Sequence, residues 1–200
     1  LGAEHWMKGG LGSSASTFQN GLRVGAIAVV NCMGNVFDIE TGKTVAGTRR
    51  EDGKGFYEAF ELFSGLKHHL PRSTESCENT TIGVVATNAK LRQKETARVA
   101  QMAHDGFARA IRPVHMLQDG DTIFSVATGE LDLPPPILLS LAPGPRFPEQ
   151  KGDLLAQQMD RAQFISHIGH LASEEMRKAV VRAVMKAKSV KGIPSASECQ

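Results

Sequence analysis

The sequence predicts a layered α/β or α+β domain, and three observations support this prediction. Two apolar runs rich in β-branched residues, 22–31 and 80–88, are typical of strands. Apolar residues at helical spacing follow over 91–111, then a third strand-like run over 122–128, then a long helical pattern over 154–188. The predicted order is therefore β, β, α, β, α, and 200 residues are enough for one domain.

Loops surround the first predicted strand. The small residues over 9–16 indicate a loop in which the backbone approaches another group closely. The run 22–31 is almost entirely apolar, so we expect a strand that is buried on both faces. The polar segment 42–55 indicates an exposed loop, and three phenylalanines at helical spacing predict a short helix over 56–66.

Turn-forming residues separate the later elements. The polar segment 67–79 is expected to be a loop, and 119–121 is a tight turn before the third strand, which Gly129 closes. Consecutive prolines make 133–136 a rigid loop. The last helix is expected to be interrupted near Gly169.

Composition and charge argue against several classes of partner. The net charge is +2 and no block rich in Lys and Arg is present, so we expect neither a nucleic acid nor a membrane as partner. Three cysteines lie far apart in the sequence, which is typical of free thiols in a reducing compartment such as the cytoplasm. The chain starts without a methionine or a signal-peptide pattern, and we expect it to be a fragment of a longer protein.

The junction between Asn79 and Thr80 is the strongest candidate for chemistry. Thr80 opens a strand-like run after a stretch rich in turn formers. If the Asn79–Thr80 bond is cut, the new α-amine of Thr80 can act as general base for its own hydroxyl. A threonine at the start of a strand is also ordinary, so other segments have to support this hypothesis.

Three further segments offer groups that such a nucleophile needs. Asp119 and Asp121 flank one glycine, and two carboxylates this close can share a proton or orient an amine, although a plain Asp-Gly turn has the same sequence. Asn31 can donate to an oxyanion from the end of a strand or bond its own turn instead. Lys8 can neutralise a negative intermediate or lie on the surface.

The sequence indicates no cofactor and no metal ion. The run 9–16 has neither the Gly-Lys-Ser/Thr ending of a phosphate-binding loop nor the spacing of a dinucleotide fingerprint. His167 and His170 lie three residues apart on the last predicted helix, but a third metal ligand at suitable spacing is not evident.

Several segments along the chain carry one resemblance when they are taken together. They are KGGLGSSAS (8–16), VGAIAVVNCMG (24–34), NTTIGVVATNAKL (79–91), AHDGFARAIRPVH (103–115), DGDTIFSVATG (119–129) and the closing helix up to Ser195. Together they resemble the L-aminopeptidase/D-esterase family (peptidase family S58), with the 6-aminohexanoate-oligomer (nylon oligomer) hydrolase branch nearest. The resemblance implies a four-layer α/β/β/α sandwich of the self-processing N-terminal-nucleophile type.

The resemblance also implies a division of the chain and a set of roles. Cleavage between Asn79 and Thr80 would separate the C-terminal portion of an α subunit, 1–79, from a β subunit, 80–200, which together form one domain. Thr80 would be the nucleophile and Asn31 an oxyanion donor. Asp119 and Asp121 would assist the amine and hydroxyl, with Lys8 as a further catalytic residue. The implied substrate is a small peptide or amide, and the implied assembly is a homo-oligomer of processed α/β units.

Two alternatives to this amide hydrolase remain open. An acyltransferase of the ornithine acetyltransferase type shares self-cleavage before a threonine. The resemblance also implies an active-site tyrosine in an earlier part of the α subunit, and Tyr57, the chain's one tyrosine, lies in a segment that does not match it. An inactive, truncated scaffold is therefore the second alternative.

Overall fold

A four-stranded mixed sheet is the centre of the computed structural model, which describes residues 5–58, 61, 79–132 and 154–199. Its strands are β1 (Gly10–Thr17), β2 (Arg23–Val30), β5 (Ile82–Ala89) and β7 (Thr122–Leu131), in the order β1-β2-β5-β7. The pairs β1–β2 and β2–β5 are antiparallel, and the pair β5–β7 is parallel. A parallel pair needs a crossover, and helix α2 (Gln93–Ala110) supplies it.

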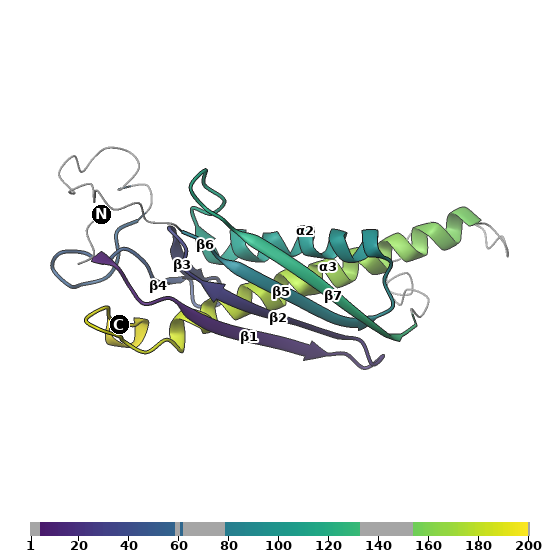
Figure 1. Ribbon diagram of the computed structural model, residues 1–200, viewed down its shortest axis with the longest axis horizontal. Coiled ribbons are helices and arrows are strands. Elements are labelled where there is room, and N and C mark those ends of the chain that lie inside the picture. The colour runs from purple at the N-terminus through teal and green to yellow at the C-terminus, as the bar shows by residue number, and fades with distance from the viewer. Residues whose placement is uncertain (1–4, 59–60, 62–78, 133–153, 200) are drawn as a thin grey trace.

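Helices α2 and α3 (Leu154–Met185) cover one face of this sheet (Figure 1). Side chains of a strand alternate between its two faces, so every second residue of the strands points into this helix–sheet core. The largest fully buried side chains come from both layers: Leu22, Val24, Val85, Val99, Phe107, Ile111, Ile168, Met176 and Val180.

The opposite face of the sheet carries apolar side chains that remain exposed. Ile27 is 48% exposed and Phe124 59%, and Leu11, Val29, Ile82 and Val126 lie exposed on the same four strands. The expectation that 22–31 is buried on both faces is therefore wrong for the described residues, because helices pack against one face alone. The strand itself is confirmed as β2.

All of the run 9–16 except Gly9 lies in strand β1 rather than in the predicted loop, and close packing explains the small size of its residues. A Cβ atom added to Gly10 would lie 2.3 Å from the carbonyl oxygen of Ala183, and one added to Gly12 would lie 2.2 Å from that of Ala179. Both contacts are with α3. The glycines therefore let β1 and α3 approach closely, which is a different use of glycine from a flexible turn.

Helix α3 is continuous through Gly169, so the predicted interruption is wrong. A Cβ atom at Gly169 would lie 2.3 Å from the sulfur of Met102 on α2, and one at Gly106 of α2 would lie 2.4 Å from the carbonyl oxygen of Ser173. Both glycines serve the close contact between the two helices.

A small second sheet has the order β4-β3-β6, from β3 (Asn35–Asp38), β4 (Lys43–Ala46) and β6 (Ile111–Arg112). The predicted exposed loop 42–55 therefore contains a short strand. Phe56 forms an isolated bridge with Arg49, so the predicted helix over 56–66 is wrong at its first residue. Most of that helix, nearly all of the loop 67–79 and the proline segment 133–136 lie outside the described residues.

Candidate active site

The predicted site residues meet at one end of the four-stranded sheet. Thr80 precedes β5, and its backbone N–H donates to the carbonyl of Asn31, just beyond the end of β2, at 2.9 Å. Asn79 forms a parallel bridge with Asp119, which precedes β7. The sheet pairing thus continues past the strand ends and brings the three segments into one row.

Two donors surround the carbonyl group between Asn79 and Thr80. The backbone N–H of Gly120 donates to the Asn79 carbonyl oxygen at 2.9 Å, and the Thr80 hydroxyl donates to the same oxygen at 2.7 Å. A Cβ atom on Gly120 would lie 2.6 Å from Thr80 Oγ1. Position 120 therefore fits glycine, and the Asp-Gly-Asp turn offers a backbone donor that was not predicted from the sequence.

The two carboxylates of the turn are held by backbone N–H groups. Asp121 Oδ1 accepts from the N–H of Thr81 at 2.8 Å, and Asp119 Oδ2 accepts from that of Met116 at 3.0 Å. Their other oxygens, Asp119 Oδ1 and Asp121 Oδ2, are buried and have no hydrogen-bond donor among the described residues. Buried polar atoms normally have a partner, so Asp119 Oδ1 marks a place where a proton or a substrate group can be accepted, whereas Asp121 Oδ2 faces a histidine.

Two histidines extend the site away from Thr80. His115 Nδ1 lies 3.0 Å from Asp121 Oδ2, and His115 Nε2 lies 3.3 Å from His104 Nδ1 on α2. The His115 ring is not aligned for a hydrogen bond to Oδ2, so we treat this contact as an electrostatic one. The sequence places His115 near the turn without indicating its partner.

Cys32 lies beside the same carboxylates and is not a competing nucleophile. The pKa of its thiol is raised to about 12, mainly by burial and to a smaller extent by the negative charges of Asp121 and Asp119. Its Sγ donates to the carbonyl of Gly34 at 3.1 Å. Because the thiolate is the reactive form, Cys32 is unreactive at neutral pH.

Asn31 and Lys8 are placed near the row by their backbones. The Asn31 residue is exposed, and its carbonyl holds Thr80 as described. Lys8 lies two residues before Gly10, which pairs with Val30, and its ammonium donates to the carbonyl of Gly9 at 3.0 Å. The structure thus brings Thr80, Asn79, Asp119 and Asp121 into one contacting cluster. Asn31 adjoins this cluster through its backbone carbonyl. Lys8 lies just before β1, the strand that pairs with β2.

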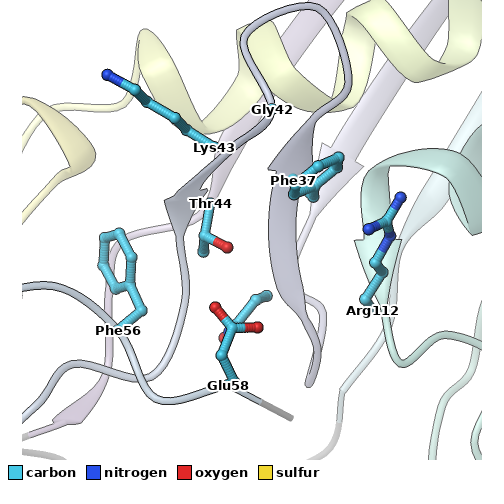
Figure 2. Close-up of a pocket in the computed structure, with 8 residues that line it drawn as sticks. Phe37, Gly42, Lys43, Thr44, Phe56, Glu58 and Arg112 are labelled. Atoms are coloured by element: carbon cyan, nitrogen blue, oxygen red, sulfur yellow. The ribbon is translucent and has the colours of Figure 1, made fainter.

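A separate hollow of about 380 Å³ lies beside the small sheet (Figure 2). Phe37 and Phe56 contribute aromatic walls, Glu58 points toward Thr44, and Lys43 extends away from the centre. The guanidinium of Arg112 lies 3.9 Å from the centre of the Phe37 ring. Its lining contains no residue of the Thr80 cluster, and it is completed by Asn35 and Gly42.

In the described part of the chain, no group of three His, Cys, Asp or Glu side chains has the arrangement of a metal site. No helix there is both long enough and apolar enough to span a membrane.

The profile of peptidase family S58 matches residues 2–197. The chain belongs to this family. An uncharacterized aminopeptidase of Mycobacterium tuberculosis is 35% identical over 94% of this S58 chain and 51% of its own length. A 6-aminohexanoate-oligomer endohydrolase of Kocuria sp. is 32% identical over 56% of this chain and 32% of its own length. The chain thus spans about half the length of the mycobacterial relative, and less of the second.

Solved structures confirm the fold class. The PH0078 protein of Pyrococcus horikoshii has a TM-score of 0.54 at 19% identity, over 98% of this chain and 44% of its own. The L-aminopeptidase D-Ala-esterase/amidase of Ochrobactrum anthropi has a TM-score of 0.50 at 18% identity, over 92% of this chain and 42% of its own. That enzyme is described as a variant of the Ntn hydrolase fold. The predicted α+β sandwich is confirmed, and the described residues contribute a helix layer and a sheet layer to it.

Proposed function

We propose that the chain belongs to a self-processing amide hydrolase with Thr80 as nucleophile. The observation that carries this proposal is the contact between the Thr80 hydroxyl and the carbonyl of the preceding residue, at 2.7 Å, with Gly120 N–H on the same oxygen. A hydroxyl adjacent to a polarised carbonyl is the arrangement that an intramolecular acyl shift needs.

Self-cleavage would proceed in two steps. The Thr80 oxygen attacks the Asn79 carbonyl carbon, its proton passes to a base, and the carbonyl oxygen gains negative charge that Gly120 N–H stabilises. The C–N bond then breaks as the Thr80 nitrogen takes a proton, which leaves an ester between Asn79 and the Thr80 oxygen. Water hydrolyses the ester and releases the Asn79 carboxylate and a free Thr80 amine. Asp119 Oδ1, buried and without a donor among the described residues, is the proposed base.

The released amine would serve the second reaction, on a substrate amide. It accepts the Thr80 hydroxyl proton, the oxygen attacks the substrate carbonyl, and the leaving amine departs with that proton. Water then hydrolyses the acyl-enzyme. In this proposal the side chain of Asn31 donates to the oxyanion, Asp119 and Asp121 orient the amine, and Lys8 adds positive charge.

The substrate class follows from the family, and we propose amide bonds of small peptides or of ω-amino-acid oligomers. Relatives at 35% and 32% identity carry the names aminopeptidase and 6-aminohexanoate-oligomer endohydrolase. Because the chain spans about half the length of its mycobacterial relative, we propose that residues outside this chain complete the substrate site, in an oligomer of processed units.

The test is a denaturing gel with mass spectrometry of the purified protein, alongside Thr80→Ala and Thr80→Ser variants. We expect pieces that correspond to 1–79 and 80–200, with Thr80 as the new N-terminus. Thr80→Ala should remain uncut and inactive on amide substrates, whereas Thr80→Ser should still be cut, because it keeps a hydroxyl. Thr128→Ala is the matched control, because Thr128 lies on β7 but outside the Thr80 cluster. Cleavage or turnover by Thr80→Ala would show that another residue is the nucleophile.

A further inference from the structure

Three titratable side chains contact one another in a row that ends at the peptide group after Thr80. His104 Nδ1 contacts His115 Nε2 at 3.3 Å, His115 Nδ1 contacts Asp121 Oδ2 at 3.0 Å, and Asp121 Oδ1 accepts the Thr81 N–H at 2.8 Å. This row of contacts connects helix α2, the segment after β6 and the turn before β7 to the start of β5.

The contacts restrict how many protons the two histidines hold. A proton on His115 Nδ1 is the arrangement that turns an N–H, rather than a lone pair, toward the Asp121 carboxylate oxygen 3.0 Å away. Between His115 Nε2 and His104 Nδ1, one nitrogen has to donate and the other to accept. The neutral pair and the singly protonated pair both satisfy this condition. A second added proton places two N–H groups face to face and breaks the contact.

The surroundings favour a neutral His104. Burial lowers its pKa below 6.5 and the neighbouring His115 lowers it further, while Asp121 and Asp105 act in the opposite direction. Two other titratable groups lie near this row of contacts: Asp119, on the same turn as Asp121, and the protonated thiol of Cys32. The ring of Phe107 lies next to both histidines, with its centroid 5.7 Å from that of His104 and 6.3 Å from that of His115.

The backbone of His115 adopts a conformation that is unusual for its residue type. Its φ is +57°, in the left-handed region, which residues with a Cβ enter at a cost. A strained backbone at a residue that contacts an active-site carboxylate is a reason to look for a role of its side chain.

We propose that His115 is a positioning residue: supported by His104, it holds the Asp121 carboxylate on the Thr81 N–H, and a second proton on the two histidines releases this support. The inference rests on the proposed role of Thr80 as nucleophile. It assigns His115 an indirect function, because its partner is Asp121 and not the reacting atoms.

The direct test is an NMR titration of the uncut Thr80→Ala chain from pH 8 to pH 5. We expect the Thr81 amide proton to shift as the pH falls below 6.5, with the midpoint at which the His104 ring titrates. In a Thr80→Ala/His115→Gln chain this shift should be lost, because glutamine does not titrate. His104→Gln should give the same loss, and it replaces His115→Gln if that variant does not fold.

The control is His170→Gln, which removes an exposed histidine of α3 and should leave the Thr81 titration unchanged. A Thr81 amide that does not shift, or that still shifts in both His115→Gln and His104→Gln, would overturn the inference. Neither result depends on cleavage, so the inference and the proposed function are tested separately.

In the chain with Thr80 intact, His115→Gln should slow self-cleavage at pH 8 by about tenfold or more, since small misplacements of reacting groups have effects of this size. It should also flatten the decline of the cleavage rate toward acid pH. If Thr80→Ala is cut, the proposed function is wrong. If Thr80→Ala is uncut and His115→Gln is cut at the wild-type rate at every pH, only the positioning role is wrong.

Discussion

At the scale of single residues, Gly120 shows how a turn places chemistry. Its N–H meets the Asn79 carbonyl oxygen at 2.9 Å because Asn79 and Asp119 pair as an extension of the β5–β7 ladder. The two flanking aspartates are held by the N–H groups of Thr81 and Met116. The sheet therefore fixes donor and carboxylates together, and a side chain at position 120 would occupy the space of the Thr80 hydroxyl.

Gly120→Ala tests this packing. A new Cβ atom 2.6 Å from Thr80 Oγ1 forces the hydroxyl or the turn to move, so we expect self-cleavage to slow by about 10²-fold. A time course on a denaturing gel measures the rate. Asp132→Ala, just beyond the opposite end of β7, is the control and should cleave at the wild-type rate. An unchanged rate in Gly120→Ala would mean that the turn adjusts without loss and that the contact is not needed.

The sequence indicates part of the candidate site, and the fold explains what it leaves out. Thr80 and the two aspartates could be named as candidates because a threonine at a strand start and an Asp-Gly-Asp turn are local patterns. The donor on Gly120 and the partners of His115 could not be found, because they depend on the register between β5 and β7 and on where α2 ends.

At the scale of elements, a buried carboxylate joins β1 to α3. Glu175 accepts from the hydroxyls of Ser14 at 2.5 Å and Ser16 at 2.8 Å, and Lys178 lies 3.0 Å away. Burial alone would raise the pKa of Glu175, but the hydrogen bonds from Ser14, Lys178 and Ser16 outweigh it and lower the pKa below 4.5. The polar residues of β1 thus fit the same face as its glycines.

Glu175→Gln should destabilise the fold by about 2 kcal/mol at pH 7, the scale expected for charge-assisted hydrogen bonds. A group with a lowered folded-state pKa stabilises the fold above its unfolded pKa of about 4.5 and loses this effect as the pH falls. Urea unfolding at pH 7 and at pH 3.5 should therefore give a smaller difference between variant and wild type at the lower pH. Glu130→Gln, an exposed site on β7, is the control. An equal difference at both pH values would contradict the role of the charge.

Two of the errors in predicting elements share one cause. Glycines over 9–16 indicate a loop, yet in β1 they permit contact with α3, and Gly169 serves the contact of α3 with α2. Glycine content alone does not distinguish a turn from a close approach of backbones. Only the partner element decides this, and α3 begins more than 130 residues after the end of β1.

At the scale of the whole molecule, the exposed apolar face of the sheet is the main departure from an ordinary surface. Soluble monomers rarely leave so many large apolar side chains exposed side by side. The chain also spans about half the length of its mycobacterial relative. The four-layer form was an implication of the family resemblance, and periodicity alone did not predict that one face of β2 would remain open.

This face should bind an environment-sensitive hydrophobic dye. We expect Ile27→Thr combined with Phe124→Thr to lower dye fluorescence clearly, while the free energy of unfolding changes by less than about 1 kcal/mol because both side chains are exposed. Leu117→Thr is the control, since Leu117 is fully exposed but lies outside the sheet. Equal dye binding by the double variant and the wild type would show that the dye binds elsewhere.

The position of Thr80 within the sheet has a consequence for refolding. A cut between Asn79 and Thr80 leaves β1 and β2 on one piece and β5 and β7 on the other, yet β2 and β5 pair along six registered positions. The two products would stay together as a non-covalent complex. Once unfolded, however, they would have to find each other in solution, so folding that is unimolecular in the precursor becomes bimolecular in the product. Recovery of the cut protein from denaturant would then depend on its concentration, and the precursor would be the form in which the fold is made.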